Sequence, residues 1–78
     1  MKLTLDQLRY LVALAEEGSF TRAAERVYLT QPALSVQIRK LEEALGTRLF
    51  DRRKGTLTEA GRVAVAQARR VLEEVERL

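Results

Sequence analysis

The 78-residue sequence contains no cysteine and no histidine. The absence of cysteine excludes disulfide bonds and thiolate metal sites, and the absence of histidine removes the commonest metal ligand and general base. The sequence also has no glycine-rich phosphate-binding loop, and its carboxylates are spread over several predicted helices. We therefore expect no catalytic residue, no metal and no cofactor in this chain.

Proline and glycine are also scarce, with one Pro and four Gly in the chain. Both residue types interrupt helix interiors, so their scarcity favours long helices. Hydrophobic residues make up 46% of the sequence, but only two Tyr and two Phe are available as large aromatic anchors. A chain of this length supports one small core, and we expect a single, mainly α-helical fold.

No segment is apolar over a length that could cross a membrane. The longest aliphatic run covers residues 11–15, whereas a membrane span requires about 20 apolar residues. The first four residues carry no signal-peptide pattern. These features predict a cytoplasmic protein without a membrane partner.

The net charge of +3 is concentrated in the middle of the sequence. Positive and negative residues balance in the segments 1–30 and 56–78. Between them lie six cationic residues and three acidic ones, namely Arg39, Lys40, Arg48, Arg52, Arg53 and Lys54 against Glu42, Glu43 and Asp51. A basic patch confined to one stretch is typical of a surface that binds a polyanion.

Hydrophobic periodicity predicts two helices in the first third of the chain. The first covers residues 5–17, with Thr4 as its N-cap and Gly18 at its end. A short second helix continues to about residue 27 and is capped by Ser19 or Thr21. Ala23 and Ala24 are small and allow another helix to approach closely.

A tight connection leads to a third helix that begins beside Pro32, a residue suited to the first turn of a helix. Its N-cap is Thr30 or Gln31, it continues to about Leu45, and Gly46 ends it. Residues 48–57 then predict a small β-hairpin with glycine in the turn. Thr58 and Glu59 open a last helix that continues to the C-terminus.

The last helix carries a heptad pattern, which is typical of two helices that wind around each other. The pattern comprises Leu57, Gly61, Ala64, Ala68, Val71, Val75 and Leu78. We expect a homodimer through Ala64, Ala68, Val71, Val75 and Leu78, although the same stripe is compatible with packing on the chain's own domain. The helix ends within a heptad without a stop signal, which favours a shortened form of a longer protein over a naturally separate domain.

This order of elements is that of a winged helix-turn-helix, with residues 1–57 as the DNA-binding domain and 58–78 as a continuous linker and dimerisation helix. The outer face of the third helix then carries Gln31 and Ser35, which can hydrogen-bond to base edges, and Val36, which can touch a thymine methyl group. Arg39 can reach a guanine or a phosphate. The hairpin residues Arg52, Arg53 and Lys54 are expected to meet the DNA backbone or the minor groove.

Several blocks of the sequence closely resemble the N-terminal domain of LysR-type transcriptional regulators. They are SFTRAAER (19–26), TQPALS (30–35), QI (37–38), LE (41–42), LG (45–46), LF (49–50) and LTEAG (57–61). The resemblance extends from Leu8 to the last helix. It implies a winged helix-turn-helix whose last helix pairs with that of a partner, and two such domains that bind an interrupted palindrome in double-stranded DNA.

The resemblance also implies DNA contacts at Thr30, Gln31, Pro32, Ser35, position 36 and the basic residues of the wing. Many members carry Arg where this chain has Val36, and the hairpin is about two residues shorter than usual. In the family a C-terminal domain similar to periplasmic binding proteins senses a small molecule. That domain is absent here, so we expect no small-molecule ligand in this fragment.

We therefore expect sequence-specific binding of double-stranded DNA as a dimer, with a role in transcription regulation. The alternative is a helical interaction or dimerisation module that does not recognise DNA. RNA binding is disfavoured because few aromatic residues are available to stack on bases. A phosphate contact by Arg22 stays open, and Arg39 and Lys40 either contact DNA or form a solvated face paired with Glu43 or Glu42.

Overall fold

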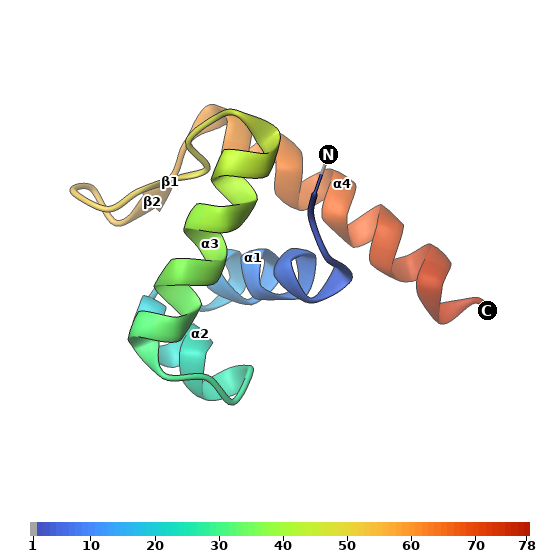
Figure 1. The fold of residues 1–78 in the computed structure, drawn as a ribbon, viewed down its shortest axis with the longest axis horizontal. Helices are drawn as coiled ribbons and strands as arrows, with labels where there is room; N and C mark the ends of the chain where they lie inside the picture. The colour runs from blue at the N-terminus through green and yellow to red at the C-terminus, as the bar shows by residue number, and fades with distance from the viewer. Residues whose placement is uncertain (1) are drawn as a thin grey trace.

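The computed structural model describes residues 2–78 and contains helices joined by short turns and one small hairpin (Figure 1). The elements are α1 (Leu5–Glu17), α2 (Phe20–Arg26), α3 (Gln31–Leu45), β1 (Phe50–Asp51), β2 (Thr56–Leu57) and α4 (Glu59–Glu76). This architecture confirms the predicted mainly α-helical winged helix-turn-helix. No helix within residues 2–78 is long and apolar enough to span a membrane.

The ends of α1 follow directly from local hydrogen bonding. The Thr4 hydroxyl accepts a hydrogen bond from the Gln7 amide, and the Gln7 side chain accepts one from the Thr4 amide, at 3.1 and 3.0 Å. These two bonds form a reciprocal capping box. At the other end Gly18 takes a left-handed conformation with φ of 69°. Both predicted boundaries of this helix are confirmed.

The structure resolves the open choice of N-cap for both α2 and α3. The Ser19 hydroxyl accepts from the Arg22 amide and caps α2, whereas the Thr30 hydroxyl accepts from the Ala33 amide and caps α3. The chain reverses at Tyr28, the one non-glycine residue with a positive φ in the described range. This turn sets the relative direction of the two helices.

The core lies where α1 meets the other helices. The fully buried large side chains are Leu11, Leu14, Leu34, Ile38, Leu41 and Leu49. Ala23 and Ala24 are also buried, so α2 packs closely on α1 and α3. The inward placement of Leu34 and the next two apolar positions of α3 agrees with the sequence prediction. One face of α3 is therefore fixed against the core, and the opposite face points to solvent.

The hairpin projects past α3 at the end opposite α2 (Figure 1). Its strands pair antiparallel, with Phe50 opposite Leu57. The Asp51 carboxylate accepts hydrogen bonds from the backbone amides of Arg53 and Lys54, at 3.0 and 3.2 Å. Gly55 takes a φ of 72°, which confirms the predicted glycine in the turn. The hairpin is thus a short wing with an internally bonded tip.

The last helix packs along α1, and its N-terminal turns belong to the core of the domain. A side chain at Gly61 would collide with the carbonyl oxygen of Leu49. Only glycine at this position therefore allows α4 to approach the segment before the wing so closely. Val65 is buried, and Leu72 packs against the same core.

The structure divides the predicted heptad stripe between two surroundings. Gly61 and Ala68 face the domain's own core, and Ala68 is only 2% exposed. For these two residues, the alternative that the stripe packs on the chain's own domain is correct. Ala64 and Val75 are half-buried, whereas Val71 and Leu78 are exposed. The apolar stripe therefore continues along α4 beyond the core of the domain.

An ionic cluster joins three helices at the end of α1. The Glu16 carboxylate contacts Arg26 of α2 at 2.7 Å and Arg69 of α4 at 3.0 Å, and Arg26 also contacts Glu17 at 3.3 Å. Hydrogen bonds from Arg26 and then Arg69 lower the pKa of Glu16 below its ordinary value. The cluster connects the helix-turn-helix to the last helix.

Candidate nucleic-acid interface

The solvent-facing side of α3 presents a row of polar side chains at helical spacing. Gln31, Ser35 and Arg39 follow one another at four-residue intervals and therefore lie on one face. Gln31 and Arg39 are exposed, and Ser35 is half-buried. Thr30 and Pro32, at the start of the helix, are exposed as well, and Val36 is 46% exposed. The structure thus gathers all the predicted α3 residues on its accessible side.

A hollow of about 350 Å³ separates this row from the wing. It is lined by Gly18, Ser19, Phe20, Gln31, Ser35, Arg39, Phe50, Arg52 and Gly55. Two of these lining residues, Phe20 and Phe50, form an edge-to-face ring pair with centroids 5.1 Å apart. Because these rings are packed together, the start of α2, the face of α3 and the base of the wing form one connected surface.

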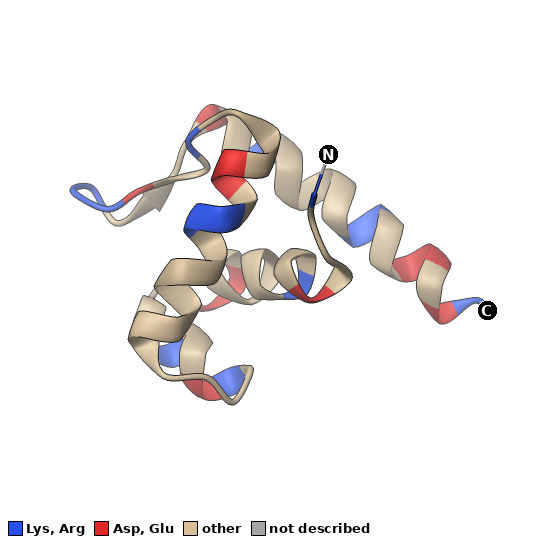
Figure 2. Ribbon diagram, in the orientation of Figure 1, with Lys and Arg blue, Asp and Glu red and all other residues tan. Residues whose placement is uncertain are grey.

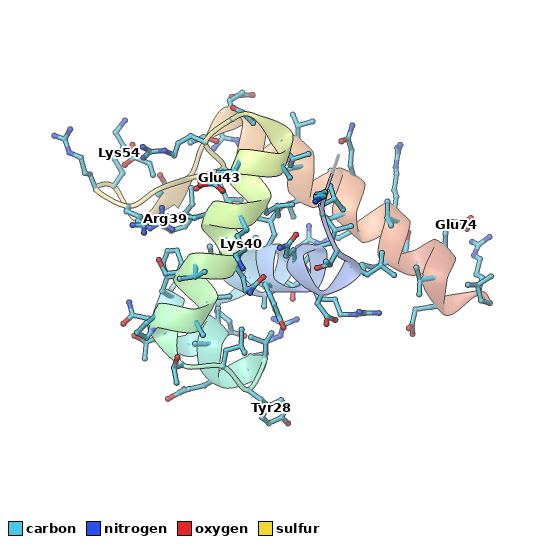
Figure 3. The ribbon with its side chains drawn as sticks, viewed as in Figure 1. Tyr28, Arg39, Lys40, Glu43, Lys54 and Glu74 are labelled. Atoms are coloured by element: carbon cyan, nitrogen blue, oxygen red, sulfur yellow. The ribbon has the colours of Figure 1, made fainter. Side chains whose placement is uncertain are left out.

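Apart from Arg52, the cationic residues of this surface lie free of carboxylate partners in the described part of the chain. Figure 2 shows positive charge at the tip of the wing and on α3, and Figure 3 shows Arg39 and Lys54 on the same side of the molecule. Within residues 2–78, no carboxylate oxygen lies within 4.0 Å of the side-chain nitrogens of Arg39, Lys40, Arg53 or Lys54. Their charge is therefore available to an external anion.

Arg52 differs from the other two basic residues of the hairpin. Arg52 lies in the turn of the hairpin, but its side chain folds back onto α3 and is only 28% exposed. Its guanidinium donates to the Ser35 hydroxyl at 3.3 Å and lies 5.2 Å from the centroid of the Phe20 ring. Arg53 and Lys54 are exposed, as predicted.

Glu42 is a structural residue of the site that the sequence prediction missed. It was considered as a surface partner for Arg39 or Lys40, yet it is 8% exposed. Its Oε2 accepts hydrogen bonds from the backbone amides of Leu49 and Phe50, at 2.8 and 3.3 Å. The available signal was its position four residues after Ile38, on the apolar side of the helix. Glu42 attaches the base of the wing to α3.

A family profile covers most of the chain. The family described as bacterial regulatory helix-turn-helix protein, lysR family, matches residues 5–62. The chain belongs to this family. The match spans the helix-turn-helix, the wing and the start of α4, which are the elements that build the surface described above.

Relatives and solved structures agree with this assignment. A probable RuBisCO transcriptional regulator of Gracilaria tenuistipitata var. liui is 50% identical over 74 residues, which are 92% of this chain and 24% of that protein. The BenM DNA-binding domain in complex with catB site 1 DNA superimposes with a TM-score of 0.92 at 40% identity, covering 96% of this chain and 83% of that one. For Vibrio fischeri DarR in complex with DNA, the TM-score is 0.94 at 35% identity, and the match covers 99% of this chain and 27% of that one.

These matches define what the chain is at the level of the domain. It is a LysR-family DNA-binding domain of the kind found in transcription regulators, and this family is not enzymatic. The chain spans about a quarter of the length of the curated relatives that it matches.

Proposed function

We propose that α3 enters the major groove of double-stranded DNA while the wing tip contacts the phosphate backbone or the minor groove. The observation that carries this proposal is the row of Gln31, Ser35 and Arg39 on the exposed face of α3, beside cations that no carboxylate neutralises. A helix of this kind fits the major groove of B-form DNA. The solved complexes of BenM and DarR with DNA support DNA as the binding partner.

Each side chain then has a chemical role. Gln31 can pair with an adenine edge, Val36 can touch a thymine methyl group, and Arg39 can reach guanine or phosphate. Thr30 and Pro32 are close enough to the start of α3 to approach the backbone beside it. Arg53 and Lys54 supply phosphate contacts from the wing, whereas Lys40 and Arg22 are secondary candidates on the flanks.

We also infer that two copies associate through the outward part of α4. Ala64, Val71, Val75 and Leu78 continue an apolar stripe beyond the part that the domain itself covers. The stripe borders an apolar groove of about 310 Å³ that includes Leu3, Leu5, Leu8 and Leu45. A dimer of this kind presents two reading helices and therefore suits an interrupted palindrome.

These two surfaces assign different functions to the two parts of the chain. Residues 1–57 read the DNA, and residues 58–78 link and pair the two copies, although the first turns of α4 also complete the core. The relatives are named transcriptional regulators, and we propose the same role for the protein that carries this domain. Such a role places it where bacterial DNA lies, in the cytoplasm.

Selection of binding sites from random duplexes at a stated salt concentration tests this function. We expect a palindromic site whose affinity falls with salt by about 0.9 log units per log unit of salt for each phosphate neutralised. Ser35→Glu places a carboxylate in the reading face, so specific binding should disappear while the helical circular dichroism is retained.

Ala66→Glu is the matched control, because it adds the same charge at an exposed position of α4 and should leave site preference intact. Normal operator binding by Ser35→Glu contradicts the placement of the reading helix. A parent protein that dimerises but shifts no duplex supports the alternative of an interaction module without DNA recognition.

A further inference from the structure

Arg52 contacts three residues from two helices, α2 and α3. Its Nη2 donates to the hydroxyl oxygen of Ser35 at 3.3 Å and lies 3.5 Å from the Ser35 carbonyl oxygen. Its Nη1 lies 3.8 Å from the Glu42 carboxylate, and its guanidinium carbon lies over the Phe20 ring. A flexible wing residue that contacts α2 and α3 at once is oriented by the fold and not by a ligand.

The contact with Ser35 determines what the serine hydroxyl can do. An arginine side chain has only hydrogen-bond donors, so the Ser35 oxygen must be the acceptor in this pair. The serine keeps one hydrogen that it can donate, and no described residue accepts it. Arg52 occupies one of the two lone pairs of the Ser35 oxygen and leaves its hydrogen free, which favours Ser35 as a donor to an external group.

The second set of contacts connects this arrangement to the wing. Glu42 accepts from the amides of Leu49 and Phe50, the two residues at the base of the wing, and its other oxygen faces Arg52. Phe20 packs on Phe50 and beneath the guanidinium. Movement of the wing relative to α3 therefore disturbs the partner of Ser35.

We propose that Arg52 is a positioning residue that sets the base preference of Ser35, and that it is not itself a phosphate contact. In the major groove guanine, adenine and thymine offer acceptors, whereas cytosine offers its amino group as a donor. A serine that is favoured as a donor should disfavour cytosine at the base it meets. This inference rests on the proposed function, because it assigns a role within the reading surface.

The test compares Arg52→Met with Arg53→Met, which removes the same charge from the next residue. Both variants and Ser35→Ala are measured against duplexes that vary the base at each operator position, over a range of salt concentrations. We expect the parent to disfavour cytosine by about fivefold at one position, as one hydrogen bond allows. Arg52→Met and Ser35→Ala should both lose this preference, and the double variant should lose no more than either one.

Salt dependence separates positioning from direct contact. Arg53→Met should lower the slope of log affinity against log salt by about 0.9 and keep the preference, as expected for the loss of one phosphate contact. Arg52→Met should leave the slope nearly unchanged. A purely structural defect would weaken binding to all sequences and would not remove the preference at one position.

Three results would overturn the inference. The first is a fall in slope for Arg52→Met that matches Arg53→Met while the preference persists. The second is an unchanged preference in Ser35→Ala, and the third is an Arg52→Met protein that behaves like the parent in every assay. A parent that shifts no duplex contradicts the proposed function itself, which distinguishes the two failures.

If Arg52→Met fails to fold by circular dichroism, Arg52→Lys takes its place. Lysine keeps the charge but has no planar fork that can contact Ser35, Glu42 and the Phe20 ring together. We expect the preference against cytosine to fall at an unchanged salt slope. Retention of the full preference with lysine contradicts the role assigned to the guanidinium.

Discussion

Tyr28 occupies a backbone conformation that glycine usually adopts. Its φ is 62°, and its side chain is 94% exposed. The amide of Leu29 donates to the Ala24 carbonyl and the amide of Tyr28 to the Glu25 carbonyl, at 2.9 and 3.3 Å. This pattern is a Schellman motif, in which the left-handed residue ends the helix. The turn of the helix-turn-helix therefore contains local strain that no packing of the tyrosine ring offsets.

Replacing this residue should stabilise the domain. A left-handed conformation costs a non-glycine residue about 1–2 kcal/mol, and glycine loses part of that gain through its greater freedom when unfolded. We expect Tyr28→Gly to raise the free energy of unfolding by about 0.5–1 kcal/mol, measured by urea denaturation. Tyr28→Phe is the control and should leave stability unchanged. A less stable glycine variant would show that the tyrosine side chain makes a stabilising contact.

Glu42 illustrates why residue-level prediction failed at the base of the wing. Arg39, Lys40 and Glu43 lie close to it in the sequence, so a surface ion pair was the natural interpretation. Its position on the helix instead directs it inward, where it accepts from the Leu49 and Phe50 amides and faces Arg52. Those amides lie seven and eight residues after Glu42 in the sequence. They reach its carboxylate only after the chain has turned at Gly46 and the hairpin has formed.

At the scale of whole elements, the Glu16 cluster joins α2 and α4 at the end of α1. Arg26 and Arg69 approach the same carboxylate from two helices. The lowered pKa of Glu16 means that the folded state favours its ionised form. The resulting stabilisation is complete above the pKa of the unfolded chain and is lost as the pH falls through the lower pKa of the folded state.

A pH series tests this cluster. Glu16→Gln should lower the thermal unfolding midpoint at neutral pH by at most a few degrees, since all three side chains are partly solvated. The difference from the parent should shrink as the pH falls below about 4.5, the ordinary value for this group. Glu59→Gln is the control, because Glu59 forms only a local, exposed pair with Arg62. A difference that persists at low pH would indicate a packing effect of the substitution instead of a charge effect.

At the scale of the whole molecule, the course of α4 leaves an apolar stripe beside the core. The helix leaves the body of the domain toward its C-terminal end, where Figure 1 shows it extending away from the other elements. Val71 is 42% exposed there and borders the apolar groove that includes Leu5. A second copy would cover this stripe.

Val71→Glu tests the proposed pairing of two copies. A carboxylate placed in an apolar interface loses its hydration, so we expect the dissociation constant of the dimer to rise at least about tenfold in sedimentation experiments. Val63→Glu is the matched control, since Val63 is 53% exposed on the same helix but outside the stripe. Equal weakening of the dimer by both variants, or a parent protein that stays monomeric, contradicts pairing through this stripe.

The sequence by itself determined the elements and the exposed face of α3. Thr4, Gly18 and Gly46 act on neighbouring residues, and apolar spacing along a helix is a local property, so these signals could be interpreted without a fold. The candidates Gln31, Ser35, Val36 and Arg39 followed from the same periodicity, whereas Thr30 and Pro32 were implied by the family resemblance.

Only the tertiary structure decided which way Arg52 points, what Glu42 binds, and how the stripe of α4 is divided between the core and the outside. Each depends on groups that are distant in sequence and are brought together by packing. Ala68 carries an apolar side chain in either setting, and only the position of α1 beside α4 places it in the core. Spacing along one helix reveals which residues share a face, but the neighbour of that face is set by the free energy of the assembled domain.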